Sequence, residues 1–301
     1  MRENGRIKRE GGKLNGKPIL GSDGEPEREP GLLKKVKAIG WFIEEFGVAQ
    51  ISMNITNISV TPVHVAFEAC RQSANARGLR VTGSELVGMA PLKVFLDSGR
   101  YYLKKQQRSA GVSEAELIKI AVKSMGLDEL GEFDPNKKII EYAMLGENSN
   151  KLVDMTVSDF ADLTASESPA PGGGSIAALC GALGAALGAM DGNLSANKRG
   201  WESKTEFFSD LSVQAQQCKK QLLDLVDEDT AAFNKIMDAF ALSKDTAEDK
   251  AIRKEAIESA SQYATETPYR TMVAAYNCVP MLKEMVEKGN PNCLSDAAVG
   301  L

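Results

Sequence analysis

The sequence predicts an α+β protein with several domains: an N-terminal α/β sandwich subdomain, with helices packed on a mixed sheet, followed by an all-α helical bundle domain. Three observations predict this arrangement. Strand patterns alternate with helix patterns between residues 29 and 144. A turn-rich stretch, 145–151, then marks a domain boundary. Beyond it only helical patterns remain.

The expected domain limits follow from these changes in composition. Residues 1–28 are rich in Gly, Lys, Arg, Glu and Pro and lack apolar periodicity, so they are expected to be a flexible segment. The α/β subdomain is expected over 29–145, a linker over 146–155 and the helical domain over 156–301.

Individual elements are predicted from apolar spacing and from Gly, Pro or capping residues at their ends. Two strands are expected, at 50–56 and 79–87. Helices are expected at 31–46, 61–77, 91–107, 113–125, 135–144, 157–163, 176–190, 203–242, 246–265 and 269–288.

The first predicted strand has an unusual polar face. Its apolar face carries Ile51, Met53 and Ile55, and its other face carries Gln50, Ser52, Asn54 and Thr56. Because these polar groups are amides and hydroxyls rather than charges, the face is either an ordinary solvated surface or one that meets a ligand.

Composition limits the function classes. A formal net charge of −5 argues against a nucleic-acid-binding protein. The five cysteines are scattered, which predicts reduced thiols in a cytoplasmic protein. The N-terminus lacks the apolar core of a signal peptide, and the apolar run 176–190 is shorter than the roughly 20 residues that span a bilayer. We therefore expect neither a nucleic-acid nor a membrane partner.

The stretch Pro169–Ser175, Pro-Ala-Pro-Gly-Gly-Gly-Ser, is the first candidate site. Its prolines end the preceding structure, its glycines allow close backbone approach, and the helix that follows directs free N–H groups towards the loop. These features predict a seat for an anionic or strongly polar ligand. A flexible connector that leads into a core helix is the alternative.

The helix after this loop carries Gly184, Gly188 and Gly192 at four-residue spacing. These glycines share one helix face and would let another helix approach closely. Tight packing inside the bundle or across a homodimer interface is expected.

Asp229 is the second candidate site. Helical phase places it on an apolar stripe, whereas Asp224, Asp227 and Glu228 point elsewhere and are expected to be solvated charges. The stripe consists of Leu222, Leu225, Val226, Phe233, Ile236 and Phe240. Two explanations remain open: an acid in a cleft whose raised pKa suits general acid–base work, or a buried acid that caps a neighbouring helix or pairs with an arginine.

Other residue groups carry weaker signals. His64, the single histidine, is expected to be structural, because no metal-ligand or Ser-His-Asp grouping surrounds it. Lys34, Lys35 and Lys37 form a basic group that is either a solvated helix face or a seat for a carboxylate. No nucleotide P-loop and no metal ligands at sensible spacing are found.

Several motifs resemble those of a known folate-enzyme family. Residues 29–144 resemble the C-terminal subdomain of glutamate formimidoyltransferase, through the runs 30–41, 50–54 and 83–88. Residues 150–301 resemble the formimidoyltetrahydrofolate cyclodeaminase domain, through the runs 170–175, 225–229 and 289–292. In this order they resemble the bifunctional formimidoyltransferase-cyclodeaminase family.

The resemblance implies a folate-dependent enzyme of histidine degradation. Such an enzyme moves a formimino group from N-formimidoylglutamate to tetrahydrofolate, then closes 5-formimidoyltetrahydrofolate to 5,10-methenyltetrahydrofolate and releases ammonia. It implies tetrahydrofolate as substrate and carrier, no metal, and a dimer-based homo-oligomer. Asp229 matches the catalytic acid of the cyclodeaminase. The folate-binding residues implied are Gly31, Leu32, Leu33, Lys34, Lys35, Val36, Lys37, Ala38, Ile39 and Gly40, and the loop Gly172, Gly173, Gly174 and Ser175 is expected to contact folate.

The departures from the family pattern set expectations of their own. The N-terminal transferase subdomain and its catalytic histidine have no counterpart here, and the last cyclodeaminase helices are expected to be cut off at Leu301. We therefore expect a fragment that is incomplete for both activities. A methenyltetrahydrofolate cyclohydrolase and a folate-binding or assembly fragment without turnover are the alternatives.

Overall fold

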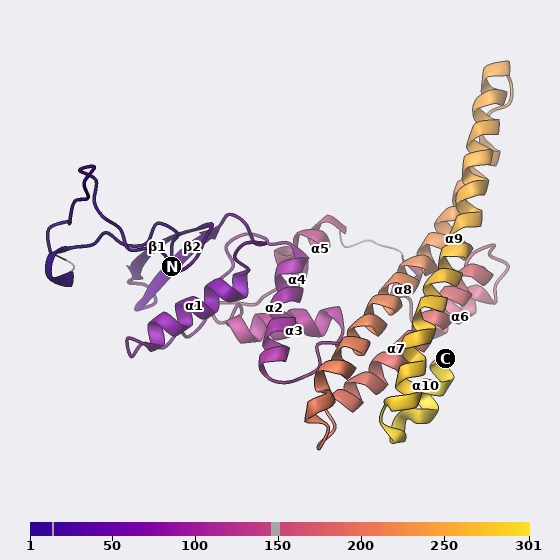
Figure 1. Ribbon diagram of the computed structural model, residues 1–301. Coiled ribbons are helices and arrows are strands. Elements are labelled where there is room, and N and C mark those ends of the chain that lie inside the picture. The colour runs from indigo at the N-terminus through magenta and orange to yellow at the C-terminus, as the bar shows by residue number, and fades with distance from the viewer. Residues whose placement is uncertain (14, 146–150) are drawn as a thin grey trace. The chain divides into compact units, whose positions relative to one another are not determined.

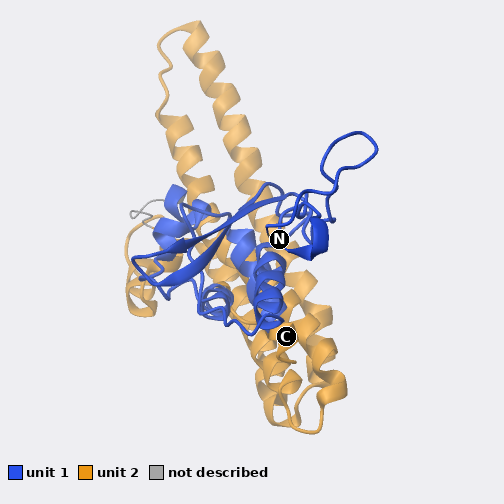
Figure 2. Ribbon diagram, turned by 90° about the vertical axis from the view of Figure 1, so that its left-hand side faces the viewer, with its two compact units in different colours: residues 1–102, 115–146 blue, residues 103–114, 147–301 orange. Residues whose placement is uncertain are grey.

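The computed structural model describes residues 1–13, 15–145 and 151–301. The chain divides into two compact units: unit 1 contains 1–102 and 115–146, and unit 2 contains 103–114 and 147–301 (Figure 2). Most of the boundary predicted at 145–151 falls outside the described residues.

Unit 1 contains a β-hairpin where the sequence predicted a helix over 31–46. Strand β1, Val36–Ile43, pairs antiparallel with β2, Val48–Ile55. Gly47, with a φ of +61°, forms part of the tight turn between them, and its N–H donates to the Glu44 carbonyl. The helix prediction was wrong because apolar residues follow one another closely in 36–43, so the segment fits both periods, while Gly40 and the β-branched residues favour the strand.

The other regular elements of unit 1 are helices. Its helices are α1 (Val63–Asn75), α2 (Leu92–Lys105, which continues into unit 2), α3 (Glu114–Met125), α4 (Pro135–Lys138) and α5 (Ile140–Leu145), and η1 (Glu10–Gly12) is a short 3-10 turn. The helix predicted over 135–144 is broken at Ile139, which forms a parallel bridge with Ala90. The hydrophobic core of unit 1 includes Phe95, Ile118, Met125 and Ile139.

The prediction of a mixed sheet was wrong. The described part of unit 1 has one sheet, the antiparallel β1–β2 pair, and 79–87 forms no strand there. The coarser α+β description agrees with the structure, whereas the α/β sandwich does not. Residues 79–87 contain Gly83 and are followed by Gly88, and a glycine inside a strand weakens it.

Residues 1–28, predicted to be flexible, have a regular pattern of backbone contacts. Antiparallel bridges join Ile7 to Arg28 and Leu20 to Pro26. Exposed ion pairs join Arg6 to Glu29 and Lys8 to Glu27. The mobility of this segment stays a prediction.

Unit 2 is a helical bundle, as the coarse prediction had it (Figure 1). Its helices are α6 (Val157–Thr164), α7 (Gly173–Ala196), α8 (Thr205–Ala241), α9 (Ala247–Lys288) and α10 (Leu294–Gly300), with 3-10 turns η2 (Leu152–Asp154), η3 (Glu202–Lys204) and η4 (Pro291–Cys293). The two helices predicted over 246–265 and 269–288 are one helix. Pro268 lies inside α9 and removes one backbone donor without ending the helix.

The small residues of α7 let the other helices approach closely. A Cβ on Gly184 would lie 2.7 Å from the Gly300 carbonyl oxygen of α10. A Cβ on Gly188 would lie 2.7 Å from Leu282 of α9, and one on Gly192 would lie 2.2 Å from the Ser212 hydroxyl of α8. The prediction of tight packing inside the bundle is confirmed.

Helix α7 has 24 residues, more than the apolar run that the sequence suggested, and by length and composition alone it could cross a membrane. In the structure it packs on α8, α9 and α10. Ala178, Ala182 and Ala185 contribute to the core, together with Leu222 and Leu225 of α8. Helix α7 is thus long enough to span a bilayer, which contradicts the reason given for expecting no membrane partner, namely the short apolar run 176–190.

Candidate active site

Asp229 lies at the N-terminal end of α7 and caps that helix from the neighbouring helix α8. Its Oδ2 accepts a hydrogen bond from the backbone N–H of Ser175 at 3.0 Å. Ser175 belongs to the first turn of α7, and Gly172, the N-cap residue, has no side chain of its own to cap the helix. The carboxylate satisfies one of the free N–H groups and lies at the positive end of the helix dipole. The capping explanation is therefore the one that the geometry matches.

Gly174 makes this approach possible. A Cβ at this position would lie 2.1 Å from Oδ1 of Asp229 and 2.4 Å from its Cγ. The carboxylate thus fills the space that any other residue type would need at position 174. Glycine is required here by the position of Asp229 rather than by backbone conformation.

Ser175 joins the start of α7 to α8. Its side chain is fully buried, and its hydroxyl donates to the carbonyl of Val226 at 2.8 Å. The same oxygen lies 3.3 Å from Oδ2 of Asp229 and 3.4 Å from the Thr230 hydroxyl. These contacts fix the end of the glycine loop against the turn of α8 that carries Asp229.

The other glycines of the loop border open space. A Cβ on Gly172 or Gly173 would meet no atom within 4 Å. Asp229 itself is only half-buried. The glycine loop and Asp229, predicted separately, therefore lie together at an accessible helix N-terminus, which is an arrangement suited to a polar ligand.

The apolar stripe around Asp229 is only half as predicted. Leu222, Leu225 and Val226 are buried, whereas Phe240 is 51% exposed. The cause is the start of α7 at the level of Asp229: beyond it, α8 and α9 continue side by side past the other helices of unit 2 (Figure 1). Asp229 thus lies at the end of the three-helix core rather than in its middle.

Two neighbouring acids predicted to be solvated are instead half-buried and bonded. Asp227 accepts a hydrogen bond from the Leu152 N–H at 2.6 Å, and burial raises its pKa. Glu228 accepts hydrogen bonds from the Tyr263 hydroxyl and from Arg270 of α9. Burial alone would raise the pKa of Glu228, but these two bonds lower it below its ordinary value. Asp224 is exposed, as predicted.

The cross-helix partners Tyr263 and Arg270 were missed in the sequence. Helical periodicity gives the direction of each side chain on its own helix, but it does not specify the register of α8 against α9. The contact from Arg270 to Glu228 defines that register in the structure.

The predicted folate stretch, 31–40, lies in unit 1 and leads into β1. Leu33 and Val36 are buried, while Leu32 and Ile39 are 71% and 64% exposed. Gly31, Lys34, Lys35, Lys37, Ala38 and Gly40 occupy the loop and the first half of the strand, and the three lysines are exposed. The lysines are therefore on a loop and a strand rather than on a helix face.

The hairpin register shows what lies beside this stretch. Lys37 pairs with Asn54, Ile39 with Ser52 and Trp41 with Gln50, so these three pairs share one face of the hairpin. Trp41 is 46% exposed. The amide and hydroxyl face noted in the sequence is thus interleaved with an ammonium, an aliphatic and an aromatic side chain.

His64 is buried in unit 1, as expected of a structural histidine. Its ring stacks on Tyr101 with centroids 4.5 Å apart, and Nδ1 lies 3.4 Å from the Ser98 hydroxyl. Ser98 donates to the Val94 carbonyl, and burial lowers the pKa of His64. This histidine is held by packing within the helices of unit 1.

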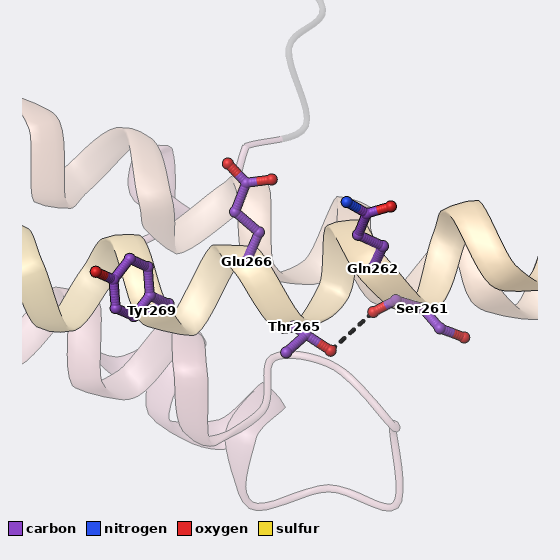
Figure 3. Close-up of a pocket in the computed structure, with 5 residues that line it drawn as sticks. All are labelled: Ser261, Gln262, Thr265, Glu266 and Tyr269. Atoms are coloured by element: carbon purple, nitrogen blue, oxygen red, sulfur yellow. Dashed lines mark hydrogen bonds between the residues drawn. The ribbon is translucent and has the colours of Figure 1, made fainter.

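One surface depression lies along α9. It is shallow and open and is lined by Ser261, Gln262, Thr265, Glu266 and Tyr269 (Figure 3). None of these residues was a predicted site residue. Among residues 1–13, 15–145 and 151–301, no group of three or more His, Cys, Asp or Glu side chains is placed to hold a metal ion.

Comparison with known proteins gives two adjacent family matches. Residues 1–145 match the Formiminotransferase domain family, and residues 156–301 match the Formiminotransferase-cyclodeaminase family. The chain is 38% identical over 273 residues to the formimidoyltransferase-cyclodeaminase of Gallus gallus, which covers 90% of this chain and 50% of that protein. It thus spans about half the length of the curated relatives of this kind.

Two further similarities each cover about half of the chain. A methenyltetrahydrofolate cyclohydrolase of Methylorubrum extorquens is 34% identical over 146 residues, covering 48% of this chain and 70% of that protein. The crystal structure of a formiminotetrahydrofolate cyclodeaminase from Thermotoga maritima is similar with a TM-score of 0.44 and 25% identity, over 50% of this chain and 71% of that one.

Proposed function

Because the chain belongs to the formimidoyltransferase-cyclodeaminase family, we propose that it is a folate-dependent enzyme of histidine degradation. The domain of residues 156–301 converts 5-formimidoyltetrahydrofolate to 5,10-methenyltetrahydrofolate and ammonia. The subdomain of residues 29–145 serves the linked transfer of a formimino group from N-formimidoylglutamate to tetrahydrofolate. Two family matches in this order along the chain support the pairing of the two activities.

The observation that carries the cyclodeaminase proposal is the placement of the Asp229 carboxylate. It is held at the N-terminus of α7 by the Ser175 N–H and lies against Gly174, with open space beside Gly172 and Gly173. Within the described residues, both hydrogen bonds to this carboxylate reach Oδ2. Oδ1 is therefore available to a substrate.

One carboxylate suffices for the proton transfers of this reaction. N10 of the folate attacks the formimino carbon, a C–N bond forms, and N10 loses its proton. The bond between this carbon and the formimino nitrogen then breaks, and that nitrogen must leave protonated, as ammonia. Asp229 takes the proton from N10 and returns it to that nitrogen, which is general base and general acid catalysis by one group.

The glycine loop supplies the polar wall of this site. The first turn of α7 keeps N–H groups directed towards Gly172 and Gly173, and the helix dipole favours a polar or anionic part of the substrate there. Ser175 positions the loop and does not itself take part in the chemistry, because its hydroxyl is buried and donates to Val226.

For the transfer activity, the face of the β1–β2 hairpin is the proposed folate surface. It carries Lys37 and Ile39 of the folate stretch, and Trp41 with its partner Gln50. An aromatic side chain, amides and an ammonium group suit a flat heteroaromatic ring with a carboxylate tail. The neighbouring Lys34 and Lys35 are exposed and add positive charge.

A dimer-based homo-oligomer in the cytoplasm is part of the proposal. Exposed apolar side chains on α9, namely Tyr269, Met272 and Tyr276, support self-association. The five cysteines are free, which agrees with a reducing compartment.

Replacing Asp229 with Asn tests the catalytic role. Asn keeps an acceptor for the Ser175 N–H but is not a base, so the same substitution in an intact homologue should leave the fold unchanged and abolish ammonia release from 5-formimidoyltetrahydrofolate. Asp224→Asn is the matched control, because it removes an exposed carboxylate of the same helix. Ammonia release by Asp229→Asn at the rate of the control would remove Asp229 from the mechanism.

The similarity to a methenyltetrahydrofolate cyclohydrolase makes hydrolysis the second candidate function. The same carboxylate would then activate water on the methenyl compound. Ammonia release identifies deamination, turnover of the methenyl compound alone identifies hydrolysis, and binding of folate with neither product identifies a non-catalytic folate-binding protein.

A further inference from the structure

The run Gly289–Asn292, one of the motifs of the cyclodeaminase resemblance, has no part in the proposed mechanism. It leads from α9 into η4 and is bound to the C-terminal end of α7. The backbone N–H of Asn290 donates to the Ser195 hydroxyl oxygen at 2.8 Å, and that hydroxyl donates to Oδ1 of Asp191 at 3.0 Å. Lys198 Nζ donates to the side-chain oxygen of Asn290 at 3.1 Å. The turn is thus held on α7 by a chain of hydrogen bonds that ends at the carboxyl group of Asp191.

Asp191 is fully buried, and its second oxygen lacks a partner. Its exposed fraction is 0%, and within the described parts of the chain Oδ2 has no hydrogen-bond partner. Gly289 lies directly beside it, because a Cβ on Gly289 would be 2.6 Å from Oδ2 and 3.0 Å from Oδ1. The same Cβ would be 2.4 Å from the Met285 carbonyl oxygen, in the last turn of α9. The carboxyl group therefore packs against a glycine and a helix C-terminus.

The charges around Asp191 oppose its ionisation. The C-terminus of α9 carries the negative end of a helix dipole, which disfavours a further negative charge. Asp296 of α10 acts on Asp191 with the same sign, and burial raises the pKa of the neighbouring Cys293 thiol of η4. Lys198, the cation at this end of α7, donates to Asn290 instead.

The long helices α8 and α9 present uncharged groups at this level. Around Gly192, the next residue of α7, lie the Ser212 hydroxyl and the Phe208 carbonyl of α8 and the Met285 methyl group of α9. Burial raises the pKa of Asp191 and Asp296 adds to this effect, whereas hydrogen bonding by Ser195 opposes it. A buried carboxylate without a paired cation is costly, so the neutral acid fits this position better.

We propose that Asp191 is a pH-sensitive latch for the C-terminal segment 289–300: the neutral acid keeps the segment on α7, and loss of its proton to solvent releases it. An ionised carboxylate needs water, and moving the Gly289–Asn292 turn admits water to Oδ2. Helix α10 follows this turn and is packed closely on α7, since a Cβ on Gly300 would lie 2.8 Å from the Gly184 carbonyl oxygen. It is therefore released together with the turn.

The direction of the pH dependence follows from the raised pKa. The latch is closed below the unfolded pKa of about 4 and opens as pH rises through the higher folded value. Because one proton controls the equilibrium, the ratio of released to bound segment should rise about tenfold per pH unit above that value. Asp191 lies roughly 25 Å along the α7 axis from Gly174, so the opening can be measured apart from the chemistry at Asp229.

Hydrogen exchange of the full 301-residue chain, followed by mass spectrometry, tests this latch. Rates are measured from about pH 5 to 9 and divided by the intrinsic exchange rate at each pH. We expect the protection of peptides from 289–300 to fall as pH rises, while peptides from the α8 core, such as Leu222–Val226, keep theirs. Constant protection in 289–300, or an equal loss in the α8 core, would overturn the proposal.

Two variants and a control identify the titrating group. Asp191→Asn keeps an acceptor for Ser195 but cannot ionise, so the protection of 289–300 should become independent of pH; the parent's pH dependence in this variant contradicts the latch. Asp296→Asn leaves Asp191 in place and removes a neighbouring negative charge, so the loss of protection should begin at lower pH. An unchanged onset there counts against Asp191 even if Asp191→Asn does not fold. Asp224→Asn removes an exposed acid and should reproduce the parent profile, whereas a shift equal to that of Asp296→Asn would indicate a general charge effect and refute the latch.

Discussion

Replacing Gly174 with alanine moves the Asp229 carboxylate while keeping it in the protein. The added Cβ would lie 2.1 Å from Oδ1 and 2.7 Å from Oδ2, so the carboxylate must turn away from α7. Because it is the end of a side chain, it turns easily, and the loss is that of a helix cap, about 1 kcal/mol. Alanine restores roughly 0.4–1 kcal/mol by restricting the unfolded chain. The free energy of unfolding should therefore change by less than about 1 kcal/mol.

Ammonia release should respond far more strongly than stability. A displacement of about 1 Å of a catalytic group costs on the order of 100-fold in rate, and this substitution forces a movement of at least that size. The assay is ammonia release from 5-formimidoyltetrahydrofolate by an intact homologue that carries the substitution, measured beside thermal unfolding of the same samples.

Gly131→Ala is the control for this prediction, because Gly131 lies outside the proposed site. Its Cβ would meet no atom within 4 Å, so we expect unchanged activity and slightly higher stability. If Gly174→Ala and Gly131→Ala release ammonia at equal rates, the position of the carboxylate has no bearing on turnover and the proposed mechanism is refuted.

Three further substitutions test other parts of the structure. Asp191 is buried, and burial raises its pKa, so its contribution to stability falls as pH rises above the unfolded pKa of about 4. The Tm of Asp191→Asn should therefore increase relative to the parent chain as pH rises above about 4, and a constant difference would contradict this. Arg270→Ala leaves the half-buried Glu228 with fewer donors and should lower stability by about 1 kcal/mol in denaturant titrations, whereas no change would show that the pair contributes nothing. Trp41→Ala should leave the Tm unchanged and weaken binding of 5-formyltetrahydrofolate about 3- to 10-fold by calorimetry, while equal affinity would remove this side chain from the folate surface.

Helical periodicity predicted most of the helical unit but not every interruption. The extents of α6 and α8 agree with the sequence to within a few residues, since long amphipathic patterns are the most reliable signal. Pro268 misled the prediction, because a single missing N–H is tolerated inside a helix that packs along most of its length. In 31–46, closely spaced apolar residues fit two periods, and the pairing of Val36–Ile43 with Val48–Ile55 decided between them.

The candidate site shows the same division between local and tertiary information. Helical phase identified Asp229 as the acid that faces inward, because direction on one helix depends on sequence spacing alone. It misjudged Asp227 and Glu228, whose partners Leu152 and Arg270 come from distant parts of the chain. The sequence also did not distinguish the three loop glycines. In the structure, position 174 requires glycine for the approach of Asp229, whereas positions 172 and 173 border open space.

This difference among the glycines bears on how a capping residue can also be a catalyst. An acid that only caps a helix needs an acceptor near the first-turn N–H groups, and Asn or Ser serves equally well. The chain instead has a carboxylate whose Oδ2 holds the cap while Oδ1 lies against Gly174, beside a loop with unfilled space. Fixing one oxygen by the Ser175 N–H orients the other. In the proposed mechanism the cap therefore positions the base, and the chemistry depends on the oxygen that the cap leaves free.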